Sequence, residues 1–148
     1  MIKKKIYIAT TFQEDKRSDM HTAIDLLRNL GFEVYAPVEH IIPNAWDYPN
    51  DEWGLMVFES DVEAIKQSDY VVMLSYGRES NVGATAGTNW EAGFAFGIGK
   101  KVIIVEMTDN IMSLMVANGR YATVKGLSGL KNYDWVNLPQ TRTKTEQK

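Results

Sequence analysis

The chain has 148 residues, of which 45% are hydrophobic and 24% are charged, and its formal net charge is -3. These values are typical of one globular domain with a sizeable core, and the charge gives no electrostatic footprint for nucleic-acid binding. The sequence has no cysteine, which excludes disulfides, thiolate catalysis and cysteine-ligated zinc, and its two histidines argue against a histidine-rich metal site. No apolar run approaches the roughly 18 residues that cross a bilayer, so we do not expect the protein to insert in a membrane. Because the net charge is not basic, we do not expect a nucleic acid as a partner either.

The first segment, MIKKKIYIATTF, is basic and then apolar, as a short signal peptide would be. Its apolar part is brief and β-branched, and no small-residue cleavage site follows it. We therefore interpret residues 6–10 as a buried first strand, in a protein that we expect to be cytoplasmic.

Helical and extended patterns alternate along the rest of the chain. Apolar residues at helical spacing end at Gly31, and short apolar runs typical of strands follow at 32–35, 70–74, 101–105 and 121–124. The pattern predicts further helices at 51–67, 88–97 and 110–116, and long loops at 38–50 and 75–87. Residues 1–137 are expected to form one domain, followed by a polar, frayed tail at 138–148.

This alternation predicts an α/β fold: a single domain with a mainly parallel five-stranded sheet flanked by helices, of the Rossmann or flavodoxin type. Right-handed connections place helices on both faces of such a sheet. Ligands bind beyond the carboxyl ends of its strands. Three loops should therefore converge at the ligand site, namely the one after residue 10 and those at 39–50 and 75–87.

Asp61 lies in an i, i+4 row with Trp53, Val57 and Ile65 on the predicted helix at 51–67. A carboxylate in line with apolar residues is partly desolvated, which raises its pKa and suits proton transfer. A structural role, in which Asp61 pairs with a buried hydroxyl or amide, fits the same pattern.

Glu91 begins an apolar stripe that continues through Phe94, Ala95 and Ile98. With a helix start at Thr88, Glu91 lies in the first turn, where the helix dipole favours the ionised form that a nucleophile needs. The segment from Thr88 to Glu91 also matches the S/T-x-x-E capping box, so a purely structural cap is the competing interpretation.

The glycine-rich loop before Glu91 contains Gly83 and Gly87, which permit close backbone approach to a phosphate or a sugar. It has neither the GK ending of a P-loop nor a GxGxxG motif, so binding of a nucleoside triphosphate or a dinucleotide is not favoured. Arg78 in this loop fits either a ligand contact or a surface position. Tyr7 lies in the first strand, where its ring suits the core and its hydroxyl needs a partner such as a carboxylate.

Several short segments together resemble the nucleoside 2-deoxyribosyltransferase family over about residues 4–137. KIYIAT followed by Phe12 is similar to the family's first strand and loop, and the W-x7-D spacing occurs from Trp53 to Asp61. AGTNWEAGFAFGIGKKVIIV resembles the G-T-x-(aromatic)-E-x-G-x-A element that carries the nucleophilic glutamate. DNIMSLM resembles the family's N-(I/L)-M segment, and NYDW lies near the end. The order and spacing of these pieces make the resemblance specific.

The resemblance implies a role for each matching residue. Glu91 matches the nucleophile that attacks C1' of the deoxyribose, Tyr7 matches the tyrosine that orients it, and Asp61 matches an acidic residue near the base, a candidate proton donor. Asn110 and Met112 match a segment that reaches the active site of a neighbouring subunit, which implies a homo-oligomer with shared sites. On the same grounds, the other substrate-binding positions are Phe12, Trp53, Thr85 and Gly87.

Two features depart from the family's pattern. Many members carry an aspartate that contacts the base two residues before the GT pair, but this chain has Thr85 there. A hydroxyl cannot take a proton as a carboxylate does at pH 7, so base selectivity and base protonation stay open. Some members end in a tyrosine whose terminal carboxylate approaches the site, whereas this chain ends in TRTKTEQK.

The implied activity is transfer of 2-deoxyribose between nucleobases in nucleoside salvage, through a covalent deoxyribosyl–Glu91 intermediate. The expected ligands are small deoxynucleosides and free bases, and the chemistry requires no metal or redox cofactor. The aromatic residues available to stack on a base in the expected site are Trp46, Tyr48 and Trp53.

Two other functions are compatible with the same residues. A 2'-deoxynucleoside 5'-monophosphate N-glycosidase would share the glutamate and need phosphate contacts, for which the chain offers Arg78, Ser80 and Ser113. A non-catalytic nucleoside-binding sensor is the second alternative. The acidic pair Asp61 and Glu91 argues against the sensor, because a sensor gains nothing from an attacking carboxylate.

Overall fold

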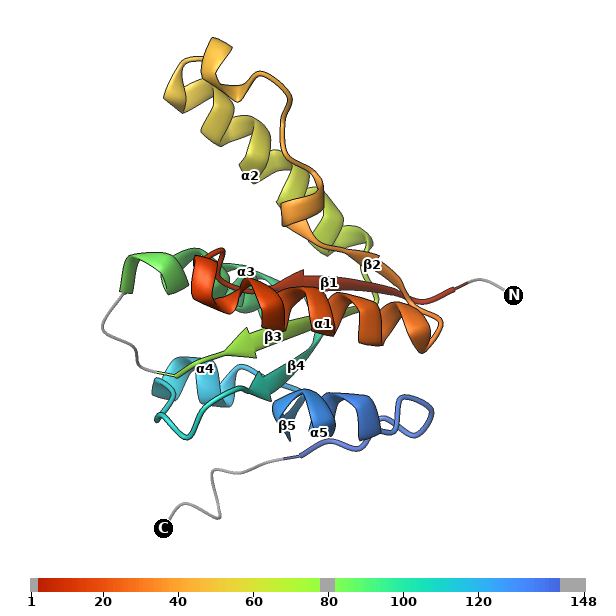
Figure 1. Cartoon of the computed structure of the whole chain (residues 1–148). Coiled ribbons are helices and arrows are strands. Elements are labelled where there is room, and N and C mark those ends of the chain that lie inside the picture. The colour runs from red at the N-terminus through yellow and green to blue at the C-terminus, as the bar shows by residue number, and fades with distance from the viewer. Residues whose placement is uncertain (1–2, 78–81, 142–148) are drawn as a thin grey trace.

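The computed structural model describes residues 3–77 and 82–141, without the side chains of 82–85. Its strands are β1 (Lys5–Ala9), β2 (Glu33–Tyr35), β3 (Tyr70–Ser75), β4 (Lys101–Glu106) and β5 (Ala122–Lys125). Its helices are α1 (Arg17–Asn29), α2 (Asn50–Gln67), α3 (Val82–Gly97), α4 (Leu114–Asn118) and α5 (Gly126–Asn132), with 3-10 turns η1 (Glu14–Lys16), η2 (Pro37–Glu39) and η3 (Ala45–Asp47). Figure 1 shows their arrangement.

The five strands form one sheet in the order β2-β1-β3-β4-β5, and every pair is parallel. The predicted fold class is therefore confirmed. The order reverses between β1 and β3, since the chain first moves outward to β2 and then returns past β1. Such a switch point opens a crevice at the carboxyl ends of the two strands, where ligands of this architecture bind.

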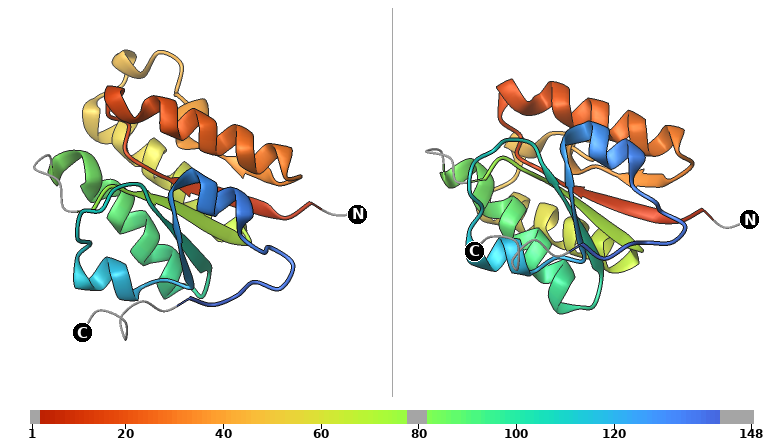
Figure 2. Two further views of the ribbon diagram at one scale, coloured as in Figure 1. Left: turned by 60° about the horizontal axis from the view of Figure 1, so that its bottom comes forward. Right: turned by 90° about the horizontal axis from the view of Figure 1, so that it is seen from below.

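Side-chain alternation along the strands divides the core into two layers. Ile6 and Ile8 face a cluster formed with α1 and α5, whereas Tyr7 and Ala9 face a second cluster that includes residues of α2 and α3. Figure 2 shows α1 and α5 on one side of the sheet and α2 and α3 on the other. Because both faces are covered, the strands are the apolar runs that a buried parallel sheet requires.

The strand bounds differ from the predicted ones by at most one residue, and Gly31, at φ +99°, ends α1 as predicted. Three helices differ more. The helix α3 begins at Val82 instead of residue 88, and α4 covers Leu114–Asn118 instead of 110–116. The unpredicted helix α5 is short and glycine-containing, and its buried Leu130 docks it on the sheet.

The predicted fraying of the chain from residue 138 is wrong for residues 138–141. The hydroxyl of Tyr121 donates to the carbonyl of Leu138, and the hydroxyl of Tyr133 donates to the carbonyl of Pro139. Thr141 exchanges hydrogen bonds with the backbone of Thr123 in β5. These contacts hold the segment against the edge of the sheet.

One part of the molecule stands clear of the sheet. We call residues 41–58 the arm; it contains η3 and the first half of α2, and Figure 1 shows it projecting beyond the other elements. The arm exposes large apolar side chains, namely Ile41, Trp46, Tyr48, Trp53, Leu55, Met56 and Phe58.

Within the described ranges, no helix is long and apolar enough to cross a membrane.

Candidate active site

A cavity of about 690 Å³ opens at the switch point. Its walls are the segment after β1, one side of α2 and one side of α3. Both carboxylates singled out in the sequence, Asp61 and Glu91, line it from opposite helices. The lining residues are Thr10, Thr11, Phe12, Gln13, Pro37, Gly54, Val57, Phe58, Asp61, Val62, Ile65, Gly87, Thr88, Trp90 and Glu91.

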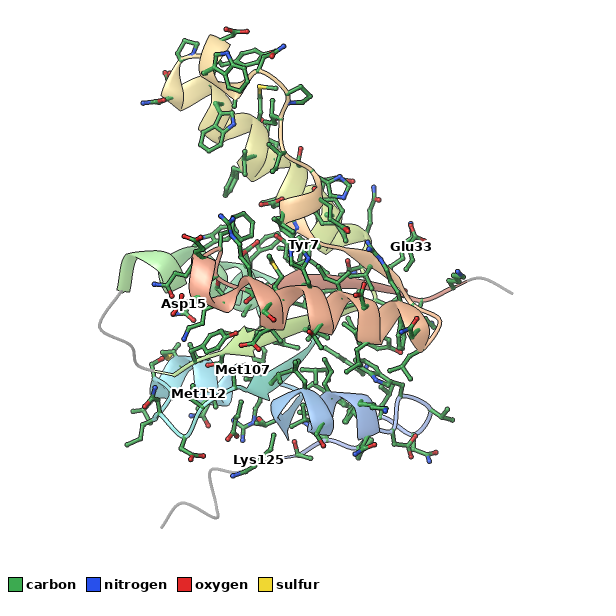
Figure 3. The ribbon with its side chains drawn as sticks, in the orientation of Figure 1. Tyr7, Asp15, Glu33, Met107, Met112 and Lys125 are labelled. Carbon is green, nitrogen blue, oxygen red and sulfur yellow. The ribbon has the colours of Figure 1, made fainter. Side chains whose placement is uncertain are left out.

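Glu91 is held by a hydrogen bond from Tyr7. The Tyr7 hydroxyl donates to Oε2 of Glu91, and the tyrosine side chain is fully buried. Figure 3 places Tyr7 between β1 and the lower end of α2. Burial and the neighbouring Glu91 charge raise the pKa of Tyr7, so its hydroxyl stays a neutral donor. The predicted partnership of Tyr7 with a carboxylate is confirmed.

The local packing of α3 explains how Glu91 comes so close to β1. Thr88, Ala92 and Ala95 form the buried side of the helix, and all three are small. Small side chains let the helix backbone lie near the sheet, which brings the Glu91 carboxylate within reach of the Tyr7 hydroxyl. The predicted stripe holds for Ala95, whereas Ile98 is 41% exposed and does not belong to it.

The predicted position of Glu91 at a helix N-terminus is wrong. The helix α3 starts at Val82, so Thr88 and Glu91 lie in its interior and neither acts as a cap. The helix dipole therefore gives the carboxylate no first-turn stabilisation. Burial instead raises the pKa of Glu91 to about 7, the Tyr7 hydrogen bond lowers it, and the charge of Asp61 raises it.

Asp61 has a tyrosine neighbour as well. Burial raises the pKa of Asp61 to about 6, while the charge of His40 and hydrogen bonding by the Tyr35 hydroxyl lower it. The predicted i, i+4 row is confirmed for Val57, Asp61 and Ile65, which all line the cavity. The desolvation expected of Asp61 is thus present, and its hydroxyl neighbour is Tyr35.

The two tyrosines are cross-strand neighbours. Tyr7 in β1 is paired in register with Tyr35 in β2, and their rings stack with centroids 5.6 Å apart. The His40 ring stacks on the other side of Tyr35 at 4.1 Å. The sheet register therefore sets the spacing of two tyrosine–carboxylate pairs, Tyr7 with Glu91 and Tyr35 with Asp61. Sequence reasoning missed Tyr35, although its place at the end of a predicted strand was a usable signal.

The structure separates the predicted substrate-binding residues into two groups. Phe12 and Gly87 line the cavity, whereas Trp53 does not. Asn110 donates its side-chain amide to the carbonyl of Tyr76, and Met112 packs against the edge of the second core cluster, near α4 in Figure 3. Neither residue lines the cavity.

Some predicted contacts lie outside the described residues. The side chain of Thr85 belongs to this group, as do Arg78 and Ser80. The glycine-rich loop predicted up to residue 87 is shorter, because Gly83 and Gly87 belong to α3. The proposed cradle of loop backbone at a helix start is therefore wrong for Gly87.

The aromatic residues predicted to stack on a base lie apart from this cavity. Trp46, Tyr48 and Trp53 belong to the arm and do not line the cavity, because α2 turns away from the sheet toward its N-terminus. The aromatic wall consists instead of Phe12, Phe58 and Trp90, with the last two rings 5.2 Å apart. The signal for it was present in the sequence: Phe58 lies one helical turn before Asp61, and Trp90 precedes Glu91.

A larger cavity of about 820 Å³ lies along β2, on the other side of Tyr35 and His40. Neither Asp61 nor Glu91 lines it. Arg28 and Glu39 in its wall pair with each other, with Nη1 to Oε2 at 2.8 Å. The smaller cavity, which two desolvated carboxylates line, is therefore the candidate active site.

Comparison with known proteins agrees with this geometry. The family model for nucleoside 2-deoxyribosyltransferase matches residues 6–129. The chain belongs to the nucleoside 2-deoxyribosyltransferase family. It is thus a glycosyl-transferring enzyme, and the resemblance seen in the sequence is confirmed.

A solved structure supports the same assignment. The 2-deoxyribosyltransferase of the psychrotolerant bacterium Bacillus psychrosaccharolyticus is 30% identical to this chain and superimposes with a TM-score of 0.82. The match covers 93% of this chain and 98% of the other. That protein is described as a biocatalyst for the synthesis of antiviral and antitumoral nucleosides. No curated protein matches the chain by sequence.

Proposed function

We propose that this enzyme transfers 2-deoxyribose from a deoxynucleoside to a free nucleobase through a covalent deoxyribosyl–Glu91 intermediate. The observation that carries the proposal is the placement of Glu91, a desolvated carboxylate in the wall of the cavity whose Oε2 is bound by the Tyr7 hydroxyl. This bond orients the carboxylate and leaves Oε1 for attack on C1' of the sugar.

The first half-reaction makes the covalent intermediate. Oε1 of Glu91 bonds to C1' while the bond from C1' to the base nitrogen breaks, and the bonding electrons leave with the base. Asp61, which faces the same cavity, gives its proton to the departing base. Because burial raises the pKa of Asp61 to about 6, a minor fraction of this carboxyl group stays protonated near neutral pH.

The second half-reaction reverses these steps with another base. A nitrogen of the incoming base attacks C1', the ester bond to Glu91 breaks, and the proton of that nitrogen passes to Asp61. The Glu91 carboxylate is regenerated, so the net result is base exchange. Water in place of the base would give slow hydrolysis. In nucleoside salvage, this exchange would convert a free base into a deoxynucleoside with the sugar of another deoxynucleoside.

Chromatography of a deoxynucleoside incubated with a second base tests the proposal. Deoxyinosine with adenine should give hypoxanthine and deoxyadenosine with the wild-type enzyme, and slow hydrolysis should occur when adenine is left out. A monophosphate donor that is consumed without any acceptor would support the N-glycosidase instead. No conversion of any donor would support the sensor. Ser113 caps α4 and does not line the cavity, so the phosphate contact predicted for it is not observed.

We also propose that the enzyme is a homo-oligomer whose active sites are shared. Asn110 and Met112 do not reach the cavity of their own subunit, yet exposed apolar residues surround them. Ile111 and Leu114 are each 75% exposed, and Met115 is 85% exposed. Such a surface is typical of a contact with another protein chain.

Subunit complementation tests the shared site. We expect Met112→Ala and Glu91→Gln each to lower the exchange rate. Co-expression of the two variants should then produce some sites with both native residues and recover part of the activity. An activity no higher than the mean of the two variants, or a monomer in sedimentation equilibrium, would contradict the proposal.

A further inference from the structure

Tyr35, the hydroxyl neighbour of Asp61, lies between two other rings. Its ring stacks on Tyr7 at 5.6 Å with an interplanar angle of 11°, and on His40 at 4.1 Å with an angle of 3°. Tyr35 belongs to β2, the outermost strand on its side of the sheet, and it is only half-buried. The two stacks therefore restrict the rotation of the Tyr35 ring, which determines where its hydroxyl lies relative to Asp61.

His40 is held against Tyr35 by the turn that it follows. The backbone amide of His40 donates to the carbonyl of Pro37 at 3.0 Å. Both Nη atoms of Arg28 in α1 donate to the Glu39 carboxylate, and Nη2 also donates to the carbonyl of Val34 in β2 at 3.2 Å. A bidentate pair of this kind fixes the geometry of its partners. The turn η2 is thus anchored to both α1 and β2, and the backbone of His40 is anchored with it.

His40 also acts on Asp61 through its charge. Burial raises the pKa of Asp61, and the largest charge effect that opposes this rise comes from His40. The pKa of Glu39 is lowered by the hydrogen bond from Arg28 and, less strongly, by the charge of His40. The other charged side chains that line the cavity along β2 are those of Lys5, Glu33, Glu59 and Glu63. His40 therefore reaches Asp61 by two routes, ring contact with Tyr35 and electrostatic attraction.

The place of His40 distinguishes it from the catalytic residues. It lines the larger cavity, and it does not line the cavity that contains Asp61 and Glu91. We propose that His40 is a positioning residue, whose ring holds the Tyr35 hydroxyl toward Asp61 and whose charge acts on the same carboxylate. This inference rests on the proposed deoxyribosyl transfer, in which Asp61 is the proton donor. It extends the working part of the enzyme to an exposed residue outside the active-site cavity.

Matched substitutions at position 40 separate the ring from the charge. His40→Phe keeps a flat ring and removes the charge, so kcat should stay close to that of the wild type. The lower limb of its pH profile should move to higher pH, because a charge that lowers the pKa of Asp61 is gone. His40→Ala removes the ring as well, so the limb should move further and kcat should fall about threefold at an unchanged KM. His21→Ala, at an exposed position in α1, is the control and should behave as wild type.

A double variant tests whether His40 acts through Tyr35. With each kcat measured at the optimum pH of its own variant, Tyr35→Phe combined with His40→Ala should be no slower than Tyr35→Phe alone. Two residues that act independently would instead multiply their losses. His40 is exposed, so the melting temperature of His40→Ala should equal that of the wild type. Multiplied losses, or a lower melting temperature with an unshifted pH profile, would overturn the assignment.

Titration of Asp61 provides a measurement that needs no turnover. Carbon-13 NMR of its carboxyl group, assigned with Asp61→Asn, should show a higher pKa of Asp61 in His40→Ala and a smaller rise in His40→Phe. Equal shifts in the two variants would mean that the ring contact has no effect, and no shift in either would exclude the charge as well; both results overturn the assignment. If the wild-type enzyme exchanged no base while Asp61 titrated as expected, the proposed function alone would fail.

Discussion

The two carboxylates of the site differ in how firmly the fold holds them. Glu91 lies in a helix that packs on β1, β3 and β4, and it is tied to a fully buried tyrosine. Asp61 lies on α2, whose first half belongs to the exposed arm, and its neighbour Tyr35 is in the edge strand β2 and only half-buried. A nucleophile must be placed against one atom of the sugar, whereas a proton donor must serve bases of different shape. The difference in support matches the tasks that we propose for Glu91 and Asp61.

The two carboxylates also differ in their pKa values. The pKa of Glu91 is raised to about 7 and that of Asp61 to about 6, in both cases mainly by burial. The Asp61 charge raises the pKa of Glu91, so the two titrate as a coupled pair. Each tyrosine lowers the pKa of its own partner. The following variants test this division, from the largest expected effect to the smallest.

Removal of the proposed nucleophile should have the largest effect. We expect Glu91→Ala to lower the exchange rate by about four orders of magnitude or more, because no covalent intermediate can form. The rate is measured by chromatography of a donor nucleoside with an acceptor base. Glu33→Gln, at an exposed site in β2, is the control and should retain full activity. Robust exchange by the alanine variant would show that Glu91 is not the nucleophile.

Removal of the proposed acid should have a smaller effect that depends on the leaving base. We expect Asp61→Asn to lower kcat/KM by about a hundredfold to a thousandfold for poor leaving bases, and less for bases that leave readily as anions. The melting temperature should stay unchanged. A large fall in melting temperature, with an equal loss for every donor, would instead indicate a structural role for Asp61.

The stability of the protein should reveal the burial of Glu91. Its pKa is raised from 4.5 to about 7 on folding, so the folded state loses stability as pH rises from the lower value to the higher one. Glu91→Gln removes this loss and should be more stable than wild type by about 3 kcal/mol at pH 8, with the gain vanishing below pH 4.5. Urea unfolding at several pH values measures it. An equal difference at all pH values would contradict the titration.

Loss of the hydroxyl beside Glu91 should move one limb of the pH profile. The wild-type profile should be a bell with its limbs near pH 6 and pH 7, since one carboxyl must be ionised and the other protonated. Tyr7→Phe removes a bond that lowers the pKa of Glu91, so the upper of these values should rise. We expect about a tenfold loss of kcat at the optimum, the magnitude of one or two lost hydrogen bonds to a charged group. An unshifted profile would mean that Tyr7 only packs.

Loss of the hydroxyl beside Asp61 should have the smallest effect. Tyr35→Phe removes a group that lowers the pKa of Asp61, so the lower limb of the profile should move to higher pH. We expect only about a threefold change in kcat, because Asp61 is less constrained than Glu91. Phenylalanine keeps the ring stack with Tyr7 and His40, so the variant should fold as the wild type does. A loss larger than that of Tyr7→Phe would reverse the order of the two pairs.

Local sequence patterns predicted several features of the site correctly. The short apolar runs predicted the bounds of every strand to within one residue. The i, i+4 row predicted that Asp61 lies on the side of α2 that faces the cavity. The opening strand placed Tyr7 in the core. These features are local, since strand and helix periodicities depend on neighbours in the chain. The same locality misled at α3, where a segment rich in glycine, alanine and threonine reads as a loop and is helical in the folded chain.

The sequence by itself determined the parallel α/β architecture and, through its motifs, the family. It also identified Asp61 and Glu91 as the candidate acidic residues of the site. Only the tertiary structure decided which hydroxyl meets which carboxylate, because the contacts Tyr7–Glu91 and Tyr35–Asp61 join residues far apart in the chain and depend on the register of β1 with β2. It also decided that Phe58 and Trp90, instead of the arm's tryptophans, form the cavity wall. The physical reason is that the direction in which α2 leaves the sheet is set by packing between distant elements, and no periodicity along the chain encodes it.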